Sequence, residues 1–201
     1  MLVPGDPGRA LRLATALVDA PKMVNHHRGL WGYTGPAADG LPLTLQSTGL
    51  GGPSAAAIVD DLIALGARRL VRAGTCVALD PSLRLGDLLI VDRVIARDGT
   101  SRALGAGEEL EPDAALRAAL GDGPSGTVLT ADYGADVLAR AGARARDMTT
   151  AAVLAAAARR GAAAAAVLLV ATDARGVRLA VEALHAAELV LGRVAAGAVG
   201  V

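Results

Sequence analysis

The residues best suited to chemistry stand where short apolar runs end. Straight after the apolar start, "VPGDPGR" surrounds Asp6 with two Gly and two Pro and ends at Arg9. Asp6 is a good N-cap and Pro7 a good first helical residue, which predicts a helix with Arg9 in its first turn. Free N–H groups and a guanidinium together favour an anion. The alternative is a capped helix start with a solvated Arg.

Two further apolar runs also end in charged residues that could take part in chemistry. In "RAGTCVAL", Arg72 is followed by Gly74 and Thr75. A buried Arg needs a counter-charge, which either a protein carboxylate or a bound anion supplies. Asp173 ends the run "VLLVATD". Burial there would raise its pKa and suit it to donate a proton, whereas helix N-capping is the commoner role of Asp at such a position.

The elements that must position these residues alternate between short apolar runs and longer helical patterns. Strands are predicted in "MLV", "LPLTLQST", "RRLVRAG", "GDLLIVDRVIA", "GTVLTAD" and "AAAVLLVATD". Helices are predicted over about 7–18 and 53–65 and in "PDAALRAAL", "MTTAAVLAAAARRG" and "VRLAVEALHAAELVLGRVAAG", with loops over 98–112 and 122–126. "GLWGYTG" is expected to form a β-hairpin with "LPLTLQST". Such alternation predicts the α/β class, with the ligand crevice beyond the carboxyl ends of the strands.

Composition excludes several classes of function. Twenty basic and twenty acidic residues leave a net charge of zero, so no nucleic-acid partner is expected. The longest apolar run, 161–172, is too short to span a bilayer, so no membrane partner is expected. No spacing typical of metal ligands is present. Cys76 is the one cysteine, and the start "MLVPGDP" lacks the pattern of a signal peptide, which predicts a cytoplasmic protein.

Four stretches together resemble the nucleoside phosphorylase family, which includes hexameric bacterial purine nucleoside phosphorylases, uridine phosphorylases and methylthioadenosine nucleosidases. They are "VPGDPGR", "VNHHRGLWGYTG", "STGLGGPSAAAIVDDLIALGARRLVRAGTC", and "ARDMTTAAVLAAAARRG" followed by "VLLVATD". The resemblance covers most of the chain. It implies a single domain over residues 1–201, a three-layer α/β/α structure around a central mixed, largely parallel sheet.

The resemblance also implies a phosphorolytic site. The residues expected to hold phosphate are Gly5, Arg9, Arg72, Thr75 and, from a neighbouring subunit, Arg28. Those expected beside the nucleoside are Met148, Thr149, Cys76 and Val77. Asp173 matches the acid with which purine-specific members protonate the leaving base. The implied function is a phosphorylase-type glycosyltransferase that cleaves the N-glycosidic bond of a nucleoside, with purine favoured, inorganic phosphate as co-substrate and no cofactor. The implied assembly is a homodimer or a dimer-based higher homo-oligomer.

Departures from the family pattern keep two alternatives open. Thr149 stands where the family has a ribose-binding Glu, Val77 stands where it has a Gly beside the base, and the stretch from 132 to 148 is shortened. These changes favour an impaired member that binds phosphate or a phosphorylated metabolite as a sensor or partner subunit. A nucleosidase is the second alternative, and the retained arginines argue against it. Either Arg175 or Arg178 is expected to replace the Arg that assists the acid. Cys76 has no evident base partner and is read as a small apolar filler rather than a nucleophile.

Overall fold

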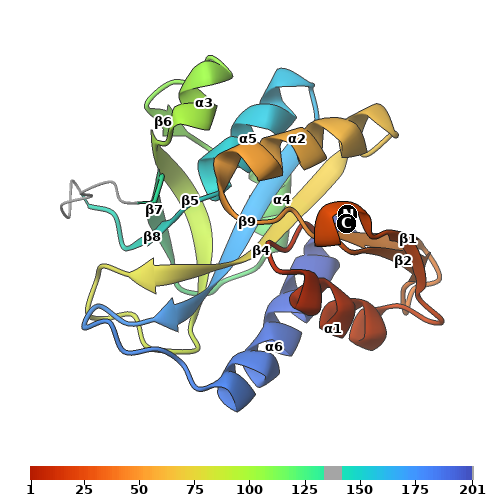
Figure 1. Ribbon diagram of the computed structural model, residues 1–201. Coiled ribbons are helices and arrows are strands. Elements are labelled where there is room, and N and C mark those ends of the chain that lie inside the picture. Colours follow the sequence, from red (N-terminus) through yellow and green to blue (C-terminus); the bar gives the residue numbers. More distant parts are fainter. Residues whose placement is uncertain (134–141, 201) are drawn as a thin grey trace.

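The computed structural model describes residues 1–133 and 142–200 (Figure 1). The helices in this part of the chain are α1 (Pro7–Leu17), the 3₁₀ turn η1 (His27–Gly29), α2 (Gly51–Ala64), α3 (Gly99–Ala103), α4 (Ala114–Ala119), α5 (Thr150–Arg159) and α6 (Val181–Val199). The strands are β1 (Lys22–Asn25), β2 (Gly32–Pro36), β3 (Pro42–Gln46), β4 (Arg69–Ala78), β5 (Leu88–Arg97), β6 (Glu109–Leu110), β7 (Ser125–Ala131), β8 (Ala145–Asp147) and β9 (Ala163–Thr172).

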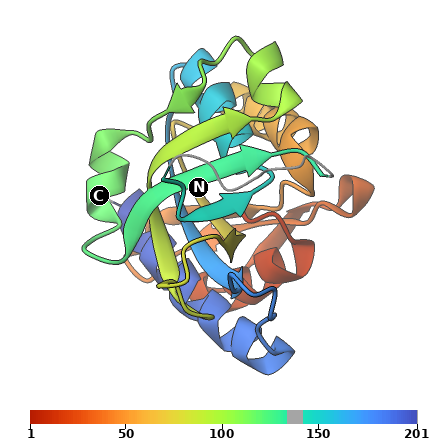
Figure 2. The same ribbon diagram turned by 90° about the vertical axis from the view of Figure 1, so that its left-hand side faces the viewer.

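The main sheet closes on itself as a barrel. Its strand order is β6-β5-β7-β8-β4-β9, and β9 pairs again with β5. The pairs β4–β9, β5–β7 and β7–β8 are parallel, whereas β4–β8, β5–β6 and β5–β9 are antiparallel. Figure 2 brings the side with β5, β7 and β8 to the front. The expected mixed sheet is therefore confirmed, and its closure as a barrel is an addition to the prediction.

The long strand β5 explains the closure. Its first residues, Leu88 to Ile90, pair with β9, and the stretch from Ile90 to Arg97 pairs with β7. A register irregularity lies between Val91 and Arg93, close to the change of partner. An extra residue of this kind bends and twists a strand. The two halves of β5 can therefore pair with different neighbouring strands. Asp92 and Arg93 lie at this irregularity in an otherwise largely apolar strand, and their charges do not by themselves predict a bend.

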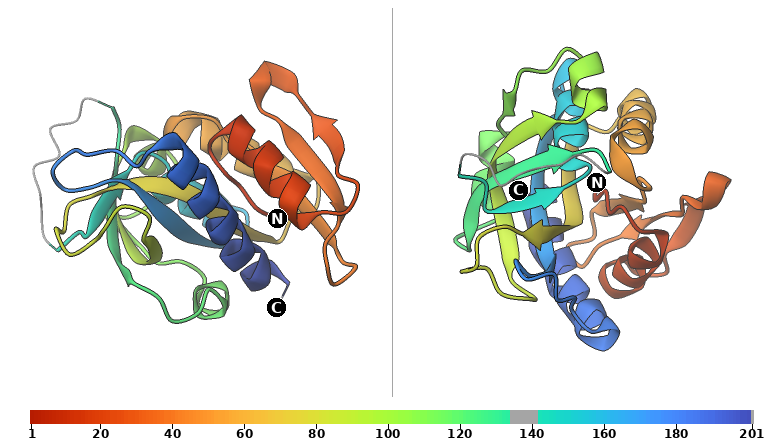
Figure 3. Two further views of the ribbon diagram at one scale, coloured as in Figure 1. Left: turned by 90° about the horizontal axis from the view of Figure 1, so that it is seen from below. Right: turned by 60° about the vertical axis from the view of Figure 1, so that its left-hand side comes forward.

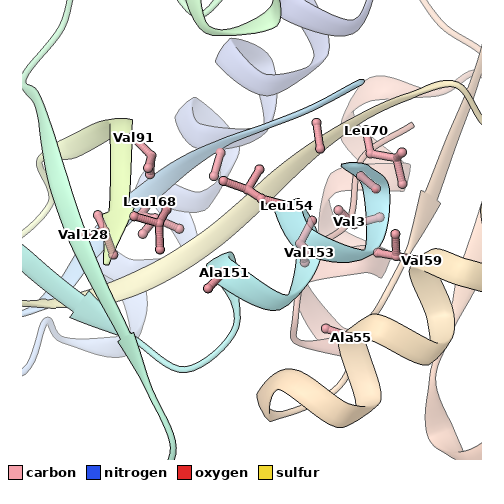
Figure 4. Close-up of a cluster of buried hydrophobic side chains, with 14 of the residues drawn as sticks. Val3, Ala55, Val59, Leu70, Val91, Val128, Ala151, Val153, Leu154 and Leu168 are labelled. Carbon is pink, nitrogen blue, oxygen red and sulfur yellow. The ribbon is translucent and has the colours of Figure 1, made fainter. Parts of the chain in front are cut away.

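Helices cover the barrel on two sides, and each side has its own core. One core contains Ala and Val of α2 and α5, and Figure 4 shows these side chains against strand residues such as Leu70 and Leu168. The other core lies under α1 and α6. Successive residues of β9 alternate between the two cores, since Leu168 belongs to the first and Leu169 to the second. Burial on both faces is why β9 reads as a continuous apolar run.

A smaller antiparallel sheet, β1-β2-β3, carries the N-terminal hairpin. Tyr33 pairs with Leu45, so the hairpin expected for "GLWGYTG" and "LPLTLQST" is confirmed, while β1 is an addition to the prediction. The run "MLV" is not a full strand, because only Leu2 makes bridges, to Leu45 and to Val71. The predicted loop over 98–112 holds α3 and β6, and Asp98 caps α3 through the N–H of Ser101 at 2.8 Å. Across residues 1–133 and 142–200, no helix is long and apolar enough to cross a membrane.

Candidate anion-binding active site

Two turns, tied to each other by backbone hydrogen bonds, form the floor of the candidate site. Asp6 caps α1 by accepting the N–H of Arg9 at 2.6 Å, as predicted. The N–H of Gly49 donates to the carbonyl of Gly5 at 3.0 Å, so the turn after β3 lies directly against the first turn. Gly49 has a φ of +74°, and a Cβ there would lie 2.6 Å from Ser54 Oγ. Glycine is thus required at this turn.

The five residues expected to hold phosphate all line one cavity of about 350 Å³, which we call the anion cavity. Its lining includes Gly5, Arg9, Arg28, Arg72 and Thr75, together with Thr149. Gly5 lies in the turn before α1, and the other residues come from α1, η1, β4 and the N-cap position of α5. The Arg28 in this lining belongs to the same chain, because η1 folds next to the first turn. Its expected delivery by a neighbouring subunit stays a prediction.

Arg72 has a protein counter-charge and one unused donor group. Its side chain is buried, its Nη2 lies 3.0 Å from Asp147 Oδ2, and its Nε donates to Thr150 Oγ1 at 3.1 Å. Burial lowers the pKa of Arg72, and Asp147 acts in the opposite direction. Within the described chain, the buried Nη1 has no hydrogen-bond partner. A buried donor without an acceptor costs about 1–3 kcal/mol, so an anion in this cavity would relieve that cost.

Asp147 is a site residue that sequence reasoning missed. Its carboxylate accepts hydrogen bonds from Thr130 Oγ1 at 2.6 Å and from the N–H and Oγ1 of Thr150 at 2.9 and 2.6 Å, besides the one from Arg72. It therefore joins β7, β8, α5 and β4 at one buried point. The available signal was an acid directly before Met148, in a stretch otherwise leading into an apolar helix.

Arg9 is held by a second buried carboxylate that sequence reasoning missed. Its Nε donates to Glu188 Oε1 at 2.8 Å, and its Nη1 lies 3.4 Å from the carbonyl oxygen of Ala73. The other oxygen of Glu188 accepts from Arg12, at 2.8 Å from Nε and 2.6 Å from Nη2. Glu188 is 1% exposed and lies 179 residues from Arg9 along the chain. Only the fold reveals this contact.

Asp173 lies in a different cavity, of about 530 Å³, which we call the Asp173 cavity. Its Oδ2 accepts from Arg175 Nε at 3.0 Å and Nη2 at 2.9 Å, and its Oδ1 accepts the N–H groups of Arg175 and Val177. Burial acts to raise the pKa of Asp173, but these hydrogen bonds outweigh it and hold the pKa below its usual value. The expectation of a raised pKa is therefore wrong. Arg175, and not Arg178, pairs with the acid.

The residues expected beside the nucleoside are not gathered in one place. Thr149 lines the anion cavity, and Met148 next to it is half-buried. Cys76 lies inside the core beneath α5, where burial raises the pKa of its thiol to about 12. Val77 follows an irregularity in the β4–β9 pairing and faces Arg146 of β8. Residues 134–141, within the stretch expected to be shortened at the base, lie outside the described residues.

The anion cavity has the chemistry of a phosphate site. Guanidinium groups form paired, directional hydrogen bonds with phosphate oxygens, and a helix N-terminus adds N–H donors and a favourable dipole. In the ranges 1–133 and 142–200, no group of three or more His, Cys, Asp or Glu residues could hold a metal ion. The charged side chains that line this cavity are those of Arg9, Arg28 and Arg72, together with the carboxylate of Asp6.

Known proteins with related sequences are nucleoside phosphorylases. Uridine phosphorylase of Thermococcus kodakarensis is 36% identical over 102 residues, which make up 51% of this chain and 36% of that enzyme. Uridine phosphorylase of Escherichia coli is 39% identical over 100 residues (50% and 39%). Guanosine phosphorylase of Halorubrum lacusprofundi is 38% identical over 101 residues (50% and 41%). The matched part of the chain spans less than half the length of each relative.

Solved structures and a family model extend the comparison to nearly the whole chain. The crystal structure of uridine phosphorylase from Vibrio fischeri ES114 superposes with a TM-score of 0.83 at 20% identity, covering 99% of this chain and 90% of that one. This likeness shows that the fold is of the nucleoside phosphorylase type. The model of the phosphorylase superfamily matches residues 1–198. The chain belongs to the phosphorylase superfamily.

Proposed function

We propose that the protein is a phosphorylase-type enzyme that cleaves the N-glycosidic bond of a nucleoside with inorganic phosphate. One observation carries the proposal. Gly5, Arg9, Arg28, Arg72 and Thr75 line a single cavity, and among the described residues the buried Nη1 of Arg72 has no hydrogen-bond partner. No organic cofactor is needed, because phosphate is the co-substrate.

The proposed reaction follows from the groups in the anion cavity. A phosphate oxygen forms a bond to the anomeric carbon, the bond from that carbon to the base nitrogen breaks, and its electron pair goes to the base. The products are a glycosyl phosphate and the free base, which takes up the proton that the hydrogen phosphate loses. Positive charge develops on the sugar in the transition state, so a dianion fixed beside it lowers the barrier. Arg9 and Arg72 orient the phosphate, and its presence excludes water as the competing nucleophile.

The purine preference that the resemblance attaches to Asp173 is not part of this proposal. Asp173 is paired with Arg175, has a lowered pKa and lines the other cavity, so its role as the proton donor to the base stays a prediction. Relatives that act on pyrimidine and purine nucleosides are both known, by their names as uridine and guanosine phosphorylases. We therefore propose a nucleoside as the substrate without specifying whether its base is a purine or a pyrimidine.

The test is base release from purine and pyrimidine nucleosides, including 5′-deoxy and 2′-deoxy forms, with and without phosphate. We expect release that depends on phosphate and is lost in Arg72→Ala. Arg69→Ala is the matched control, because Arg69 lies on the same strand, outside the lining of the anion cavity. Release that ignores phosphate would instead indicate a nucleosidase. Release unaffected by Arg72→Ala would overturn the proposal.

A second candidate is a protein that binds phosphate or a phosphorylated metabolite without phosphorolysis, as a sensor or partner subunit. Two observations favour it: the ion pair that holds Asp173, and Thr149 at the place where the family has its ribose-binding Glu. Hydrogen bonds to a charged group contribute about 1.5–3 kcal/mol each, so ribose would bind more weakly here. Measurable phosphate binding without base release from any nucleoside would support this candidate over the enzyme.

The proposal extends to a cytoplasmic homodimer. The outer strand β1 carries Met23 and Val24, which are 50% and 57% exposed at the edge of the small sheet. An exposed apolar edge strand is a surface that proteins cover, here by a second copy. Light scattering after gel filtration would measure the assembly, and a monomeric mass at working concentration would contradict this part of the proposal.

A further inference from the structure

The last helix reaches into the first turn of the protein. Helix α6 packs alongside α1, and Figure 3 shows the two helices side by side in its left view. At their contact, the buried Glu188 of α6 lies between Arg9 and Arg12 of α1. A buried carboxylate is costly unless charged donors surround it, and here two guanidinium groups supply them. Ion pairs therefore stabilise the contact between α1 and α6, in addition to the packing of apolar side chains.

The hydrogen bonds of Arg9 show what this contact does for the anion cavity. Its Nε is bound to Glu188, and its Nη1 approaches the carbonyl of Ala73. In the part of the chain that the structure describes, Nη2 has no protein partner, and Arg9 lines the anion cavity. A guanidinium is planar and rigid, so fixing Nε and Nη1 also fixes the direction of Nη2.

We propose that Glu188 is a positioning residue that holds the Arg9 guanidinium toward the bound phosphate. This inference rests on the anion site of the proposed function and adds to it a residue on α6, outside the lining of the cavity. Preorganising a donor before the ligand arrives avoids the entropy that a free Arg side chain would lose on binding. Glu188 acts only through Arg9 and does not touch the ligand.

A purely charge-balancing role for Glu188 predicts the opposite result. If Glu188 only neutralised the arginines, its removal would leave the cavity more positive, and phosphate would bind as tightly as before or more tightly. If Glu188 positions Arg9, its removal frees the guanidinium and phosphate binds more weakly. The sign of the change in affinity thus decides between the two roles.

The experiment is calorimetric titration of the folded protein with inorganic phosphate. In Glu188→Gln we expect affinity to fall by about 10- to 100-fold, because a charge-assisted hydrogen bond to the ligand is lost or misdirected. Glu188→Asp keeps the buried charge but shortens the side chain, and we expect a smaller loss in the same direction. This second variant decides the question if Glu188→Gln fails to fold.

Arg12→Gln is the matched control, because it breaks the other half of the same ion-pair network and leaves the bond between Arg9 and Glu188 in place. Its affinity for phosphate is expected to stay within about threefold of the wild type, since Arg12 is not in the cavity lining. With turnover as the readout, the Glu188 variants raise the KM for phosphate more than they lower kcat.

The failures of the two proposals are distinguishable. Phosphate binding by the wild type together with unchanged or tighter binding by both Glu188 variants would overturn the positioning role and leave the proposed function intact. An equal loss of affinity in Arg12→Gln would also overturn it, because the effect would then belong to the whole network. Absence of phosphate binding by the wild type would overturn the anion site itself.

Discussion

The anion cavity and the Asp173 cavity are built in different ways. In the anion cavity, Arg72 is held by Asp147, 75 residues away, and Arg9 by Glu188, 179 residues away. In the Asp173 cavity, the acid is held by Arg175 and Val177, two and four residues away. The first site exists only when distant parts of the chain are folded together, whereas the second is a local turn.

This difference indicates where function depends on the whole fold. In the anion cavity, Arg9 and Arg72 are buried together with their counter-charges, Glu188 and Asp147, so this part of the site tolerates little change. The side chain of Arg175 is 83% exposed, and the ion pair that it forms with Asp173 is open to solvent on one side. Exposed pairs contribute little to stability. We therefore expect substitutions in the first site to affect folding and binding together, and those in the second to affect neither strongly.

Arg72→Ala tests the strongest form of this comparison. It leaves Asp147 buried without its cation, and loss of one partner of a buried pair costs about 3–5 kcal/mol. We expect a matching fall in the free energy of unfolding in urea and loss of measurable phosphate binding by calorimetry. The control Arg69→Ala should retain phosphate binding. If the variant is as stable as the wild type, the ion pair of Arg72 with Asp147 does not contribute to the stability of the fold.

Gly74→Ala tests how closely the same site is packed. A Cβ at Gly74 would lie 2.8 Å from Arg72 Cζ and 2.7 Å from Leu168 Cδ2, so the guanidinium has to move. Overpacking of this kind costs about 1–3 kcal/mol, and we expect phosphate affinity to fall as well. Gly197→Ala is the control, because a Cβ there meets nothing within 4 Å. Equal phosphate affinity in Gly74→Ala and the wild type would show that the cavity adapts.

Asp173→Asn tests the local site. Its pKa is lowered in the folded protein, so the ionised form stabilises the fold above the unfolded value of about 3.9, and this contribution is lost as pH falls through the folded pKa. We expect a slightly lower unfolding temperature than the wild type at pH 7, and a difference that shrinks below about pH 4. Phosphate affinity should change by less than about twofold. A large loss of phosphate affinity would contradict this expectation and would indicate that the two cavities belong to one site.

Alkylation of Cys76 has the smallest expected effect. It tests whether this side chain lies in the hydrophobic core or beside the substrate. With its pKa raised to about 12, the thiolate is scarce at pH 8, and we expect alkylation by iodoacetamide to be slower than in the unfolded chain by more than about 100-fold. Phosphate, present or absent, should not alter that rate. Rapid alkylation that a nucleoside blocks would place Cys76 beside the substrate instead.

Much of the fold could be predicted from the sequence, because its elements have clear local causes. The cap at Asp6, the hairpin through Tyr33 and the buried run of β9 each follow from residues within a few positions. Closure of the barrel could not be predicted, since it depends on one strand changing partners near Val91. A largely apolar strand has the same pattern whether its sheet is open or closed.

The candidate site divides in the same way. The cavity residues Arg9, Arg72 and Thr75 could be found from motifs, because Arg9 lies in the first turn of α1 and Arg72 and Thr75 lie three residues apart in β4. Asp147 and Glu188 could not, because a buried acid is recognised by the arginine it meets and not by its neighbours in sequence. Burial alone would raise the pKa of Asp173, but hydrogen bonds from its own turn outweigh burial and lower it, and this balance cannot be read from the sequence.

The contact between Arg9 and Glu188 has a consequence for synthesis on the ribosome. The first turn is synthesised well before the acid that fixes its Arg, because 179 residues separate Arg9 from Glu188 along the chain. Until α6 leaves the exit tunnel, Arg9 lacks its counter-charge and α1 lacks its neighbour, so the nascent chain cannot complete the anion cavity. A chain interrupted before α6 should therefore remain without phosphate affinity, however much of the barrel has already formed.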